Sequence, residues 1–407
     1  MSIAQWLGRG QFVCECVPVT FTPRVAVVSA LGGALGAGVF AGFAPAALLA
    51  GPWFLPALVL PACVALLSGF GAADQARADG DAGGHGFAYA RLGRLPARLS
   101  GVAHLIGRAG VAAALAGTFA AYVLPEYRTP AALAVLIASV ASNGVRAPRR
   151  SAAAAAVFVL GVLLLVGVVC LAVPPPENPA LAGSPQVMGV LGAASVLFVA
   201  FLGFERVSGA ESARAAVPLF VGALLVITAF TGYAVLHQLG PARLGLSRAP
   251  LRDALVVADG RWLVPLLGLA VTVAVLAVLR HVFATARRTL TALVAVGDLP
   301  PVRGRVPLDI LTAACAALCV VLASPTTALA IGACAMALHY GFTNAAARIL
   351  RKEDRTWPTR TACFGLGLSV LLAICAPFDA LVVTIASLLV GVAALALRGP
   401  LTPRRRS

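Results

Sequence analysis

The chain has 407 residues, of which 60% are hydrophobic and 11% charged, against roughly 45–50% and 25% in soluble domains. This composition excludes an ordinary soluble domain. The formal net charge of +16 would suit nucleic acid, but the basic residues are not interleaved with aromatic ones, as they are in proteins that bind single strands, so no nucleic-acid partner is expected.

Hydropathy predicts an all-α polytopic membrane protein with about twelve transmembrane helices, because the apolar stretches repeatedly reach the ~20 residues that cross a bilayer. The expected spans are residues 25–49, 53–73, 99–124, 130–143, 151–173, 187–215, 217–238, 262–286, 308–323, 325–345, 360–376 and 378–397. The longest polar gaps, 74–98 and 239–261, are short enough for membrane-embedded loops or lids. No cleavable signal peptide is evident in the first residues.

Arginine and lysine are concentrated in alternate gaps between the spans. Since basic loops face the cytoplasm, both termini are expected on the cytoplasmic side of a bacterial cell membrane. The basic loops are expected to contact the lipid bilayer as well. The expected organisation is a cytoplasmic N-terminal segment (1–24), a ten-helix transport core (25–358), two additional transmembrane helices (359–398) and a basic cytoplasmic tail (399–407).

Two apolar spans far apart in the chain are interrupted. The first contains Gly32-Gly33-Ala34-Leu35-Gly36-Ala37-Gly38-Val39-Phe40, and the second runs into Gly203-Phe204-Glu205-Arg206. Unwound backbone is tolerated in hydrocarbon only where it is buried in protein or lines a cavity. Paired breaks in corresponding positions of two halves indicate the binding site of a transporter. For the glycines alone, close helix packing explains the pattern as well as substrate contact does.

Several motifs in order resemble the amino acid–polyamine–organocation (APC) superfamily of permeases over most of the chain. They are the glycine run from Leu31 to Phe40, Gly51-Pro52, Ala73-Asp74-Gln75-Ala76, Gly83-Gly84-His85-Gly86-Phe87-Ala88-Tyr89, Phe201-Leu202-Gly203-Phe204-Glu205 with Glu211, Arg214 and Pro218, Gly297-Asp298-Leu299-Pro300, and Tyr340 with Asn344 and Arg348. Asp74 stands where the family usually has Glu, and Val296 where an Asp is usual.

The resemblance implies a LeuT-like fold of five plus five helices in inverted repeats, about 25–173 and 187–345, with helices 1 and 6 broken and two extra helices. It also implies an amino acid or amine bound midway across the membrane. The substrate carboxylate is expected at the broken first helix and its ammonium at carbonyls of the second break, where phenylalanine rings would form a gate. The residues implied are Gly33, Leu35, Gly36, Ala37, Gly38, Phe198, Ala200, Phe201, Gly203 and Phe204.

One carboxylate, Glu205, lies well inside a span, where an ionisable side chain costs roughly 2.5 kcal/mol or more. His104 and Arg108 are four residues apart and therefore share a helix face. From an entry near Leu99, Arg108 lies about 13 Å along its helix. We expect Glu205 to bind and release a proton, with Arg108 or Arg206 as the partner that tunes it. A permanent ion pair that only holds helices together is the alternative.

The remaining polar residues predict less. No metal is expected at Cys14-Glu15-Cys16, because no histidine lies near it, and no cofactor is expected. Arg280 and His281 are expected to snorkel near a span end, and His339 to have an ordinary hydrogen-bonded role. A sodium site needs oxygen ligands, and the eighth span has few hydroxyl side chains, so sodium coupling is not expected.

The sequence therefore predicts a secondary transporter, not an enzyme, since no nucleophile–base set appears in a polar loop. Its expected substrate is a neutral or small amphipathic amino acid, moved by alternating access with a proton as coupling ion. Two alternatives stay open: an exchanger of cationic amino acids or polyamines, and a non-transporting membrane sensor or scaffold. The oligomeric state is not predicted.

Overall fold

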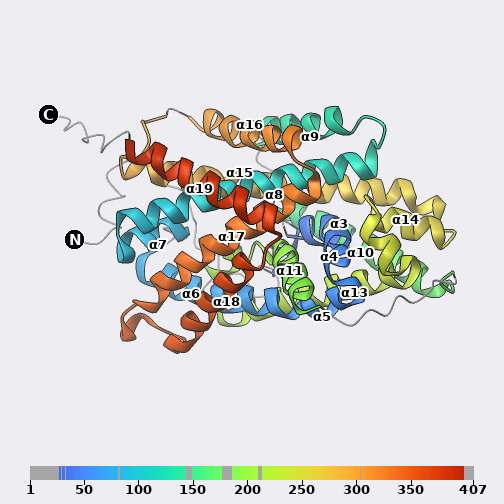
Figure 1. The fold of residues 1–407 in the computed structure, drawn as a ribbon, viewed down its shortest axis with the longest axis horizontal. Coiled ribbons are helices and arrows are strands. Elements are labelled where there is room, and N and C mark those ends of the chain that lie inside the picture. The colour runs from blue at the N-terminus through green and yellow to red at the C-terminus, as the bar shows by residue number, and fades with distance from the viewer. Residues whose placement is uncertain are drawn as a thin grey trace.

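The computed structural model describes residues 27–28, 30–32, 34–80, 83–143, 149–176, 186–209, 213–302 and 304–397. Within these ranges the regular structure is helical, with no strand. Most of the long helices run along the longest axis of the molecule (Figure 1). The predicted N-terminal segment 1–24 and the tail 399–407 lie outside the described residues.

The helices follow the chain in two groups. The first group is α3 (Ala37–Ala41), α4 (Phe43–Ala50), η1 (Gly51–Trp53), α5 (Phe54–Ala57), α6 (Val59–Asp79), α7 (Gly83–Leu92), α8 (Arg94–Val123), α9 (Arg128–Ser142) and α10 (Arg149–Ala172). The second group is α11 (Val187–Leu197), η2 (Phe198–Phe201), α12 (Glu205–Ser208), α13 (Ala213–Leu246), α14 (Pro250–Val257), η3 (Arg261–Leu263), α15 (Val264–Ala295), α16 (Val306–Leu322), α17 (Pro325–Arg348), η4 (Lys352–Asp354), α18 (Thr359–Ile374) and α19 (Phe378–Leu397).

Six segments of this set are long and apolar enough to cross a membrane. They are α6, α8, α10 from Ala152, α13, α15 together with η3, and α19. Shorter apolar helices cover Phe43–Ala57, Arg128–Ser142, Val187–Phe201, Val306–Leu322 and Thr359–Ile374. The chain is thus a multi-pass membrane protein, while the count of twelve spans stays a prediction.

Both predicted helix breaks are present. In the first span, turns precede α3, and a bend at Gly42 separates α3 from α4. In the second, α11 gives way to one 3-10 turn, the chain is extended at Leu202, and α12 then begins at Glu205. Gly203 has φ +115, a left-handed conformation that favours glycine. The glycines therefore allow the chain to leave the helix within the protein.

The two breaks pack directly against each other. A Cβ atom added at Gly38 would lie 2.1 Å from the Cβ of Ala200, and one added at Gly203 would lie 3.4 Å from the Cβ of Ala34. Only a residue without a side chain lets α3 approach η2 this closely. Contact between the two interrupted segments thus depends on Gly38.

Helix α8 is the central helix of the bundle, and its closest neighbour is α17 (Figure 1). Glycines make this crossing tight: a Cβ at Gly110 would lie 2.9 Å from the Cα of Gly332, and one at Gly332 would lie 2.9 Å from the amide of Val111. Small residues at a membrane helix interface let backbones approach in this way. The crossing fixes the register in which α8 and α17 present their polar side chains.

Helix α8 begins at Arg94, five residues before the predicted start at 99. The reason lies in Asp298, whose buried carboxylate accepts hydrogen bonds of 2.6 Å from both Arg94 and Arg98. The two arginines are thereby accommodated in the first turns of α8. Burial raises the pKa of Asp298, but the hydrogen bonds and charges of Arg98 and Arg94 lower it by more, so the pKa lies below its usual value.

Two further expectations about boundaries are corrected. The polar gaps 74–98 and 239–261 contain the helices α7 and α14. The span predicted at 217–238 starts earlier, because α13 begins at Ala213 and Pro218 lies inside it. Proline in a helix interior removes one backbone hydrogen bond, and here the helix continues through it.

Replacing Gly38 by alanine is expected to destabilise the protein, because the new methyl group would overlap the side chain of Ala200. Overpacking of this kind costs about 1–3 kcal/mol or more. Gly222→Ala is the matched control, since nothing lies within 4 Å of a Cβ added at that position. Thermal melting of the detergent-purified proteins measures the effect, and a Gly38→Ala melting temperature equal to that of the control would contradict the tight contact.

The Asp298 ion pairs predict a loss of stability in acid. Since the folded pKa of Asp298 is lowered, its contribution is complete above the unfolded carboxyl pKa of about 4 and is lost as the pH falls through the folded value. Asp298→Asn is therefore expected to lower the free energy of unfolding at pH 7, on the order of 2 kcal/mol, and hence to lower the melting temperature. Its stability should also vary less than that of the wild type below pH ~4.

Melting curves between neutral pH and the acid limit of folding, with the exposed Glu353→Gln as control, would measure the Asp298 effect. Parallel pH profiles for the wild type and Asp298→Asn would show that Asp298 does not carry this dependence.

Candidate functional site

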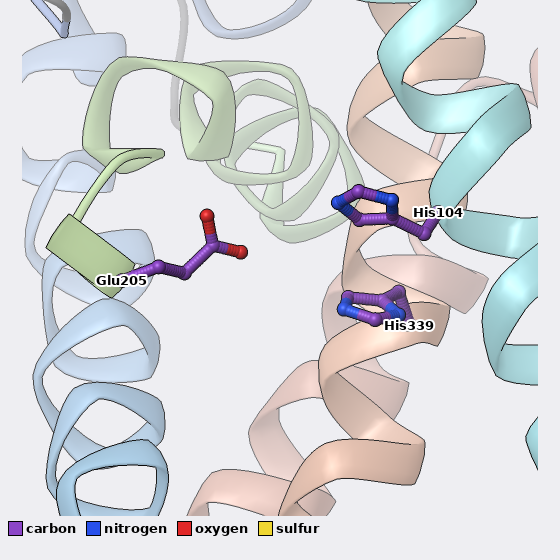
Figure 2. Close-up of side chains that lie close together, drawn as sticks. All are labelled: His104, Glu205 and His339. Atoms are coloured by element: carbon purple, nitrogen blue, oxygen red, sulfur yellow. The ribbon is translucent and has the colours of Figure 1, made fainter. Parts of the chain in front are cut away.

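A cluster of polar side chains lies where α8, α12, α15 and α17 meet; its members are buried except Glu205, whose side chain is 27% exposed. Its members are His104, Arg108, Glu205, Thr289, His339 and Tyr340. Figure 2 shows the Glu205 carboxylate, on the helix after the second break, pointing across a gap toward the imidazoles of His104 on α8 and His339 on α17. Intramembrane ionisable groups are rare and usually functional, so this cluster is the candidate site.

The centre of the cluster is an ion pair between Arg108 and Glu205. Arg108 Nη2 donates to Glu205 Oε2 at 2.9 Å, and the arginine side chain is 1% exposed. The second carboxylate oxygen, Oε1, accepts a hydrogen bond from the hydroxyl of Tyr340. The predicted contact between Glu205 and Arg108 is confirmed. The alternative partner, Arg206, instead donates to His281 Nδ1 at 2.9 Å.

The hydrogen bonds of His104 define its tautomer. Arg108 Nε lies 3.0 Å from His104 Nε2, and a guanidinium can only donate, so Nε2 is the acceptor. His104 Nδ1 then carries the proton and donates to the hydroxyl of Thr289 at 2.9 Å. The imidazole is neutral in this arrangement, and both of its nitrogens are occupied.

His339, for which an ordinary hydrogen-bonded role was expected, belongs to the cluster. Its Nδ1 lies 3.0 Å from the carbonyl oxygen of Ser100, and its ring centroid lies 4.7 Å from that of His104 and 5.2 Å from that of Tyr340. It is therefore hydrogen-bonded, as expected, but within the cluster. Gly84 on α7 approaches closely, because an added Cβ would be 2.7 Å from His339 Nε2.

A small cavity lies between the two helix breaks. Its lining residues are Ala34, Arg108, Val111, Val199, Leu202, Val278, His281 and Val282. The space open to the centre of a water molecule is about 10 Å³, which is close to the minimum for one water. We call this conformation closed because the cavity has room for about one water molecule, and Arg108 is the charged residue among those that line it.

None of the predicted substrate residues is among those that line this cavity. Ala34, Val199 and Leu202 line it and are immediate neighbours of predicted residues in the chain, and Arg108, which was predicted for proton coupling, lines it as well. His281, expected to snorkel, also lines it. Hydropathy does not give the orientation of a broken helix, so it cannot predict which residues of the breaks line the cavity and which pack against other helices.

The glycines of the first break serve helix packing in this conformation. A Cβ at Gly36 would lie 2.7 Å from Val278 Cγ2, and the place of a Cβ at Gly38 is taken by Ala200. Leu35 is buried. Gly33 lies outside the described residues, as does the side chain of Ala37. These contacts favour the packing interpretation that the sequence left open.

The three phenylalanines predicted as a gate are completely buried. Phe198 and Phe204 place their rings 5.7 and 4.9 Å from that of Tyr340, so they surround the hydroxyl partner of Glu205. Phe201 is buried in the same turn. Tyr340 links these rings to the ion pair, a role that sequence reasoning missed.

Backbone carbonyls at the second break have acceptor capacity to spare. Gly203 O accepts the amide of Arg206 at 3.1 Å, but within the described residues no hydrogen bond reaches the carbonyl oxygens of Ala200 and Phe201. Buried carbonyls are normally paired. The two carbonyls flank residues of the cavity wall and are candidate acceptors for a ligand.

Three residues of the cluster have the composition of a metal site. The ligand atoms of His104, Glu205 and His339 lie within 4.8 Å of one another. However, both nitrogens of His104 and both oxygens of Glu205 have hydrogen-bond partners, and Arg108 is one partner of each. A divalent cation would have to displace a guanidinium, so these residues do not fit a metal as they are arranged. The Cys14 and Cys16 pair lies outside the described residues.

Sequence relatives of the chain are mycobacterial transporters. It is 30% identical over 406 residues to "Uncharacterized transporter Rv1999c" of Mycobacterium tuberculosis, and equally to "Uncharacterized transporter Mb2022c" of Mycobacterium bovis. Each match covers 94% of this chain and 91% of the relative. The chain belongs to their family. It is therefore a transporter, although no protein-family profile matches it.

The fold of this transporter is shared with a solved metal transporter. Crystal structures of the Eremococcus coleocola manganese transporter, in a histidine mutant and a glutamate mutant, superpose with TM-scores of 0.56 and 0.55. Each covers 92% of this chain and 94% of the solved chain, at 13% identity. At this identity the likeness concerns the fold alone.

Proposed function

We propose that this transporter is a proton-coupled amino-acid permease of the APC superfamily, with the inverted repeats 25–173 and 187–345 and two additional helices. It moves a neutral or small amphipathic amino acid across a bacterial cell membrane by alternating access. The arginine-rich gaps support an orientation with both termini in the cytoplasm. The observation that carries the proposal is Arg108, which lines a cavity between two broken helices and forms an ion pair with Glu205.

The position of the cavity supports a transport site. Its wall contains Ala34 of the first break and Leu202 of the second, and residues of α8 and α15 complete it. Transporters built from repeats bind their substrates between such breaks. A site of this kind opens to one side at a time, and in this conformation the cavity is too small for a substrate.

Glu205 supports proton coupling because its partners can be exchanged. In the closed site its charge is compensated by Arg108 and by the Tyr340 hydroxyl. A buried carboxylate that loses its cation is costly to keep ionised. Movement of α12 away from α8 would therefore be accompanied by proton uptake at Glu205, which makes proton binding part of the conformational cycle.

The lining of the cavity supports a substrate with a small apolar side chain. Five of its residues are valine or leucine, and one is alanine. An exchanger of cationic amino acids or polyamines would need carboxylates at the wall, whereas the charged residue found there is Arg108. This chemistry favours the neutral amino acid over the cationic alternative.

A manganese transporter is the second candidate, because that cargo belongs to the solved transporter with this fold and because His104, Glu205 and His339 are grouped. Mn²⁺ prefers oxygen ligands. The guanidinium of Arg108 between two of the three groups opposes a divalent cation. The amino acid therefore remains the proposed substrate.

Uptake of a radiolabelled amino-acid mixture into proteoliposomes, with and without an inward proton gradient, tests the proposal. The gradient is expected to accelerate uptake by the wild type. Glu205→Gln, which cannot release a proton, is expected to lose this acceleration by about tenfold or more, equivalent to ~1.4 kcal/mol. The exposed Glu126→Gln is the matched control and should behave as the wild type does.

Four results would contradict the proposal. Full gradient-dependent uptake by Glu205→Gln would exclude Glu205 as the proton site. Uptake that requires internal substrate whatever the gradient would identify an exchanger. Accumulation of Mn²⁺ but of no amino acid by the same vesicles would identify a metal transporter, and absence of all uptake from a folded preparation would favour a sensor or scaffold.

A further inference from the structure

We infer that Arg108 binds the carboxylate of the substrate in exchange for Glu205, so that this transporter selects ligands with a free α-carboxylate and takes up one proton at Glu205 for each one bound. The inference rests on the proposed function and deepens it. It assigns the anion contact to a side chain of α8, whereas the sequence places it at the glycines of the first break.

Among the residues that line the cavity, one side chain is suited to bind a carboxylate. Arg108 is the charged residue among those that line the cavity, and His281 is the other polar one. A guanidinium has five N–H donors and binds a carboxylate through two parallel hydrogen bonds. In the closed site Nε and Nη2 are used by His104 and Glu205, so a ligand carboxylate competes with Glu205 for the same group.

Packing makes the first break a poor alternative in this conformation. Gly36 faces Val278, and Gly38 faces Ala200, at distances that leave no room for a methyl group. The free carbonyls of Ala200 and Phe201 lie next to Val199 and Leu202 of the wall and suit an ammonium group. A small zwitterion would thus extend from Arg108 on α8 toward the second break.

Displacement of Glu205 has a defined consequence for protons. The charged and titratable groups around it are Arg206 on its own helix, Arg108 and His104 on α8, and His339 and Tyr340 on α17, with His281 on α15 beyond Arg206. Gly69 on α6 lies beside Val217 on α13 and beside the ring of Phe204, the residue before Glu205.

Once Arg108 has turned to the substrate, the carboxylate of Glu205 keeps the hydroxyl of Tyr340 but has no cation in contact. A proton from solvent then adds to one carboxylate oxygen, since a buried carboxylate without a partner is more stable when neutral. The ligand carboxylate replaces Glu205 as the counter-charge of Arg108, and the added proton together with the neutral zwitterion leaves the site with one net positive charge. Release of the substrate restores the Arg108–Glu205 pair and expels the proton.

The test is ligand binding to the detergent-purified full chain. Each of the standard amino acids is screened for thermal stabilisation, since a ligand that binds the folded state raises its melting temperature. Each amino acid that stabilises the wild type is compared with its α-amide, which keeps the ammonium and side chain but lacks the carboxylate. The amide is expected to bind at least about tenfold more weakly, ~1.4 kcal/mol.

Two variants separate the roles of the pair. Glu205→Gln is expected to keep the preference for the carboxylate and to bind more tightly, because the competitor is gone. The double variant Arg108→Gln, Glu205→Gln is expected to bind the acid and the amide about equally. Removing both charges together avoids leaving Glu205 buried without a cation, which would be strongly destabilising.

Proton uptake is measured by titration calorimetry in two buffers of different ionisation enthalpy at the same pH. The wild type is expected to take up about one proton per substrate, as linkage between binding and protonation requires. Glu205→Gln is expected to take up close to none. A structural role for the pair would lower stability in the variants without removing this proton.

Three outcomes would overturn the inference: amides that bind the wild type as well as the acids do, a double variant that still prefers the carboxylate, or no amino acid that binds at all. Failure of the proposed function is separate. Uptake of amines without carboxylates would leave a transporter while overturning the role of Arg108. Binding with the expected proton but no uptake would support Arg108 and contradict transport.

Discussion

The buried ion pair between Arg108 and Glu205 is the constraint on which the arrangement of this membrane protein depends. A charge inside the bilayer costs several kcal/mol unless it is paired and hydrogen-bonded. Here His104 and Tyr340 supply the additional hydrogen bonds. Because the four side chains come from α8, α12 and α17, the positions of these three helices are linked. Any movement of one helix must provide new partners for the charges, which makes the pair suited to a transport cycle.

Glycines allow the helices that carry the pair to approach one another. Gly110 and Gly332 bring α8 and α17 into backbone contact, and Gly38 does the same for α3 and η2. Lipid offers little hydrophobic drive for helix association, so close packing of small residues holds such bundles together. The same glycines that interrupt the first span therefore also bury the break. Substrate contact and helix packing are competing uses of these residues, and the closed conformation favours packing.

The sequence was sufficient to predict the positions of the breaks and the contact of Arg108 with Glu205. Both follow from local rules, the conformational freedom of glycine and the cost of an unpaired intramembrane charge. It was not sufficient for His339, Tyr340 and His281, whose roles depend on which face of α15 and α17 turns inward. It also placed the start of α8 too late, because Arg94 and Arg98 look like loop residues until Asp298, two hundred residues away, is beside them.

The likeness to a manganese transporter concerns the fold, and a shared fold does not specify the cargo. A helix break between two repeats provides exposed backbone and a protected midplane, and these suit an ion or a small zwitterion equally. What separates the two is the side chain nearest the cavity. Arg108 projects a permanent positive charge there, and at a distance of a few ångströms like charges repel strongly in a poorly solvated site. A cation beside Glu205 would be repelled by the guanidinium, whereas a carboxylate would be drawn to it and would release Glu205 to accept a proton.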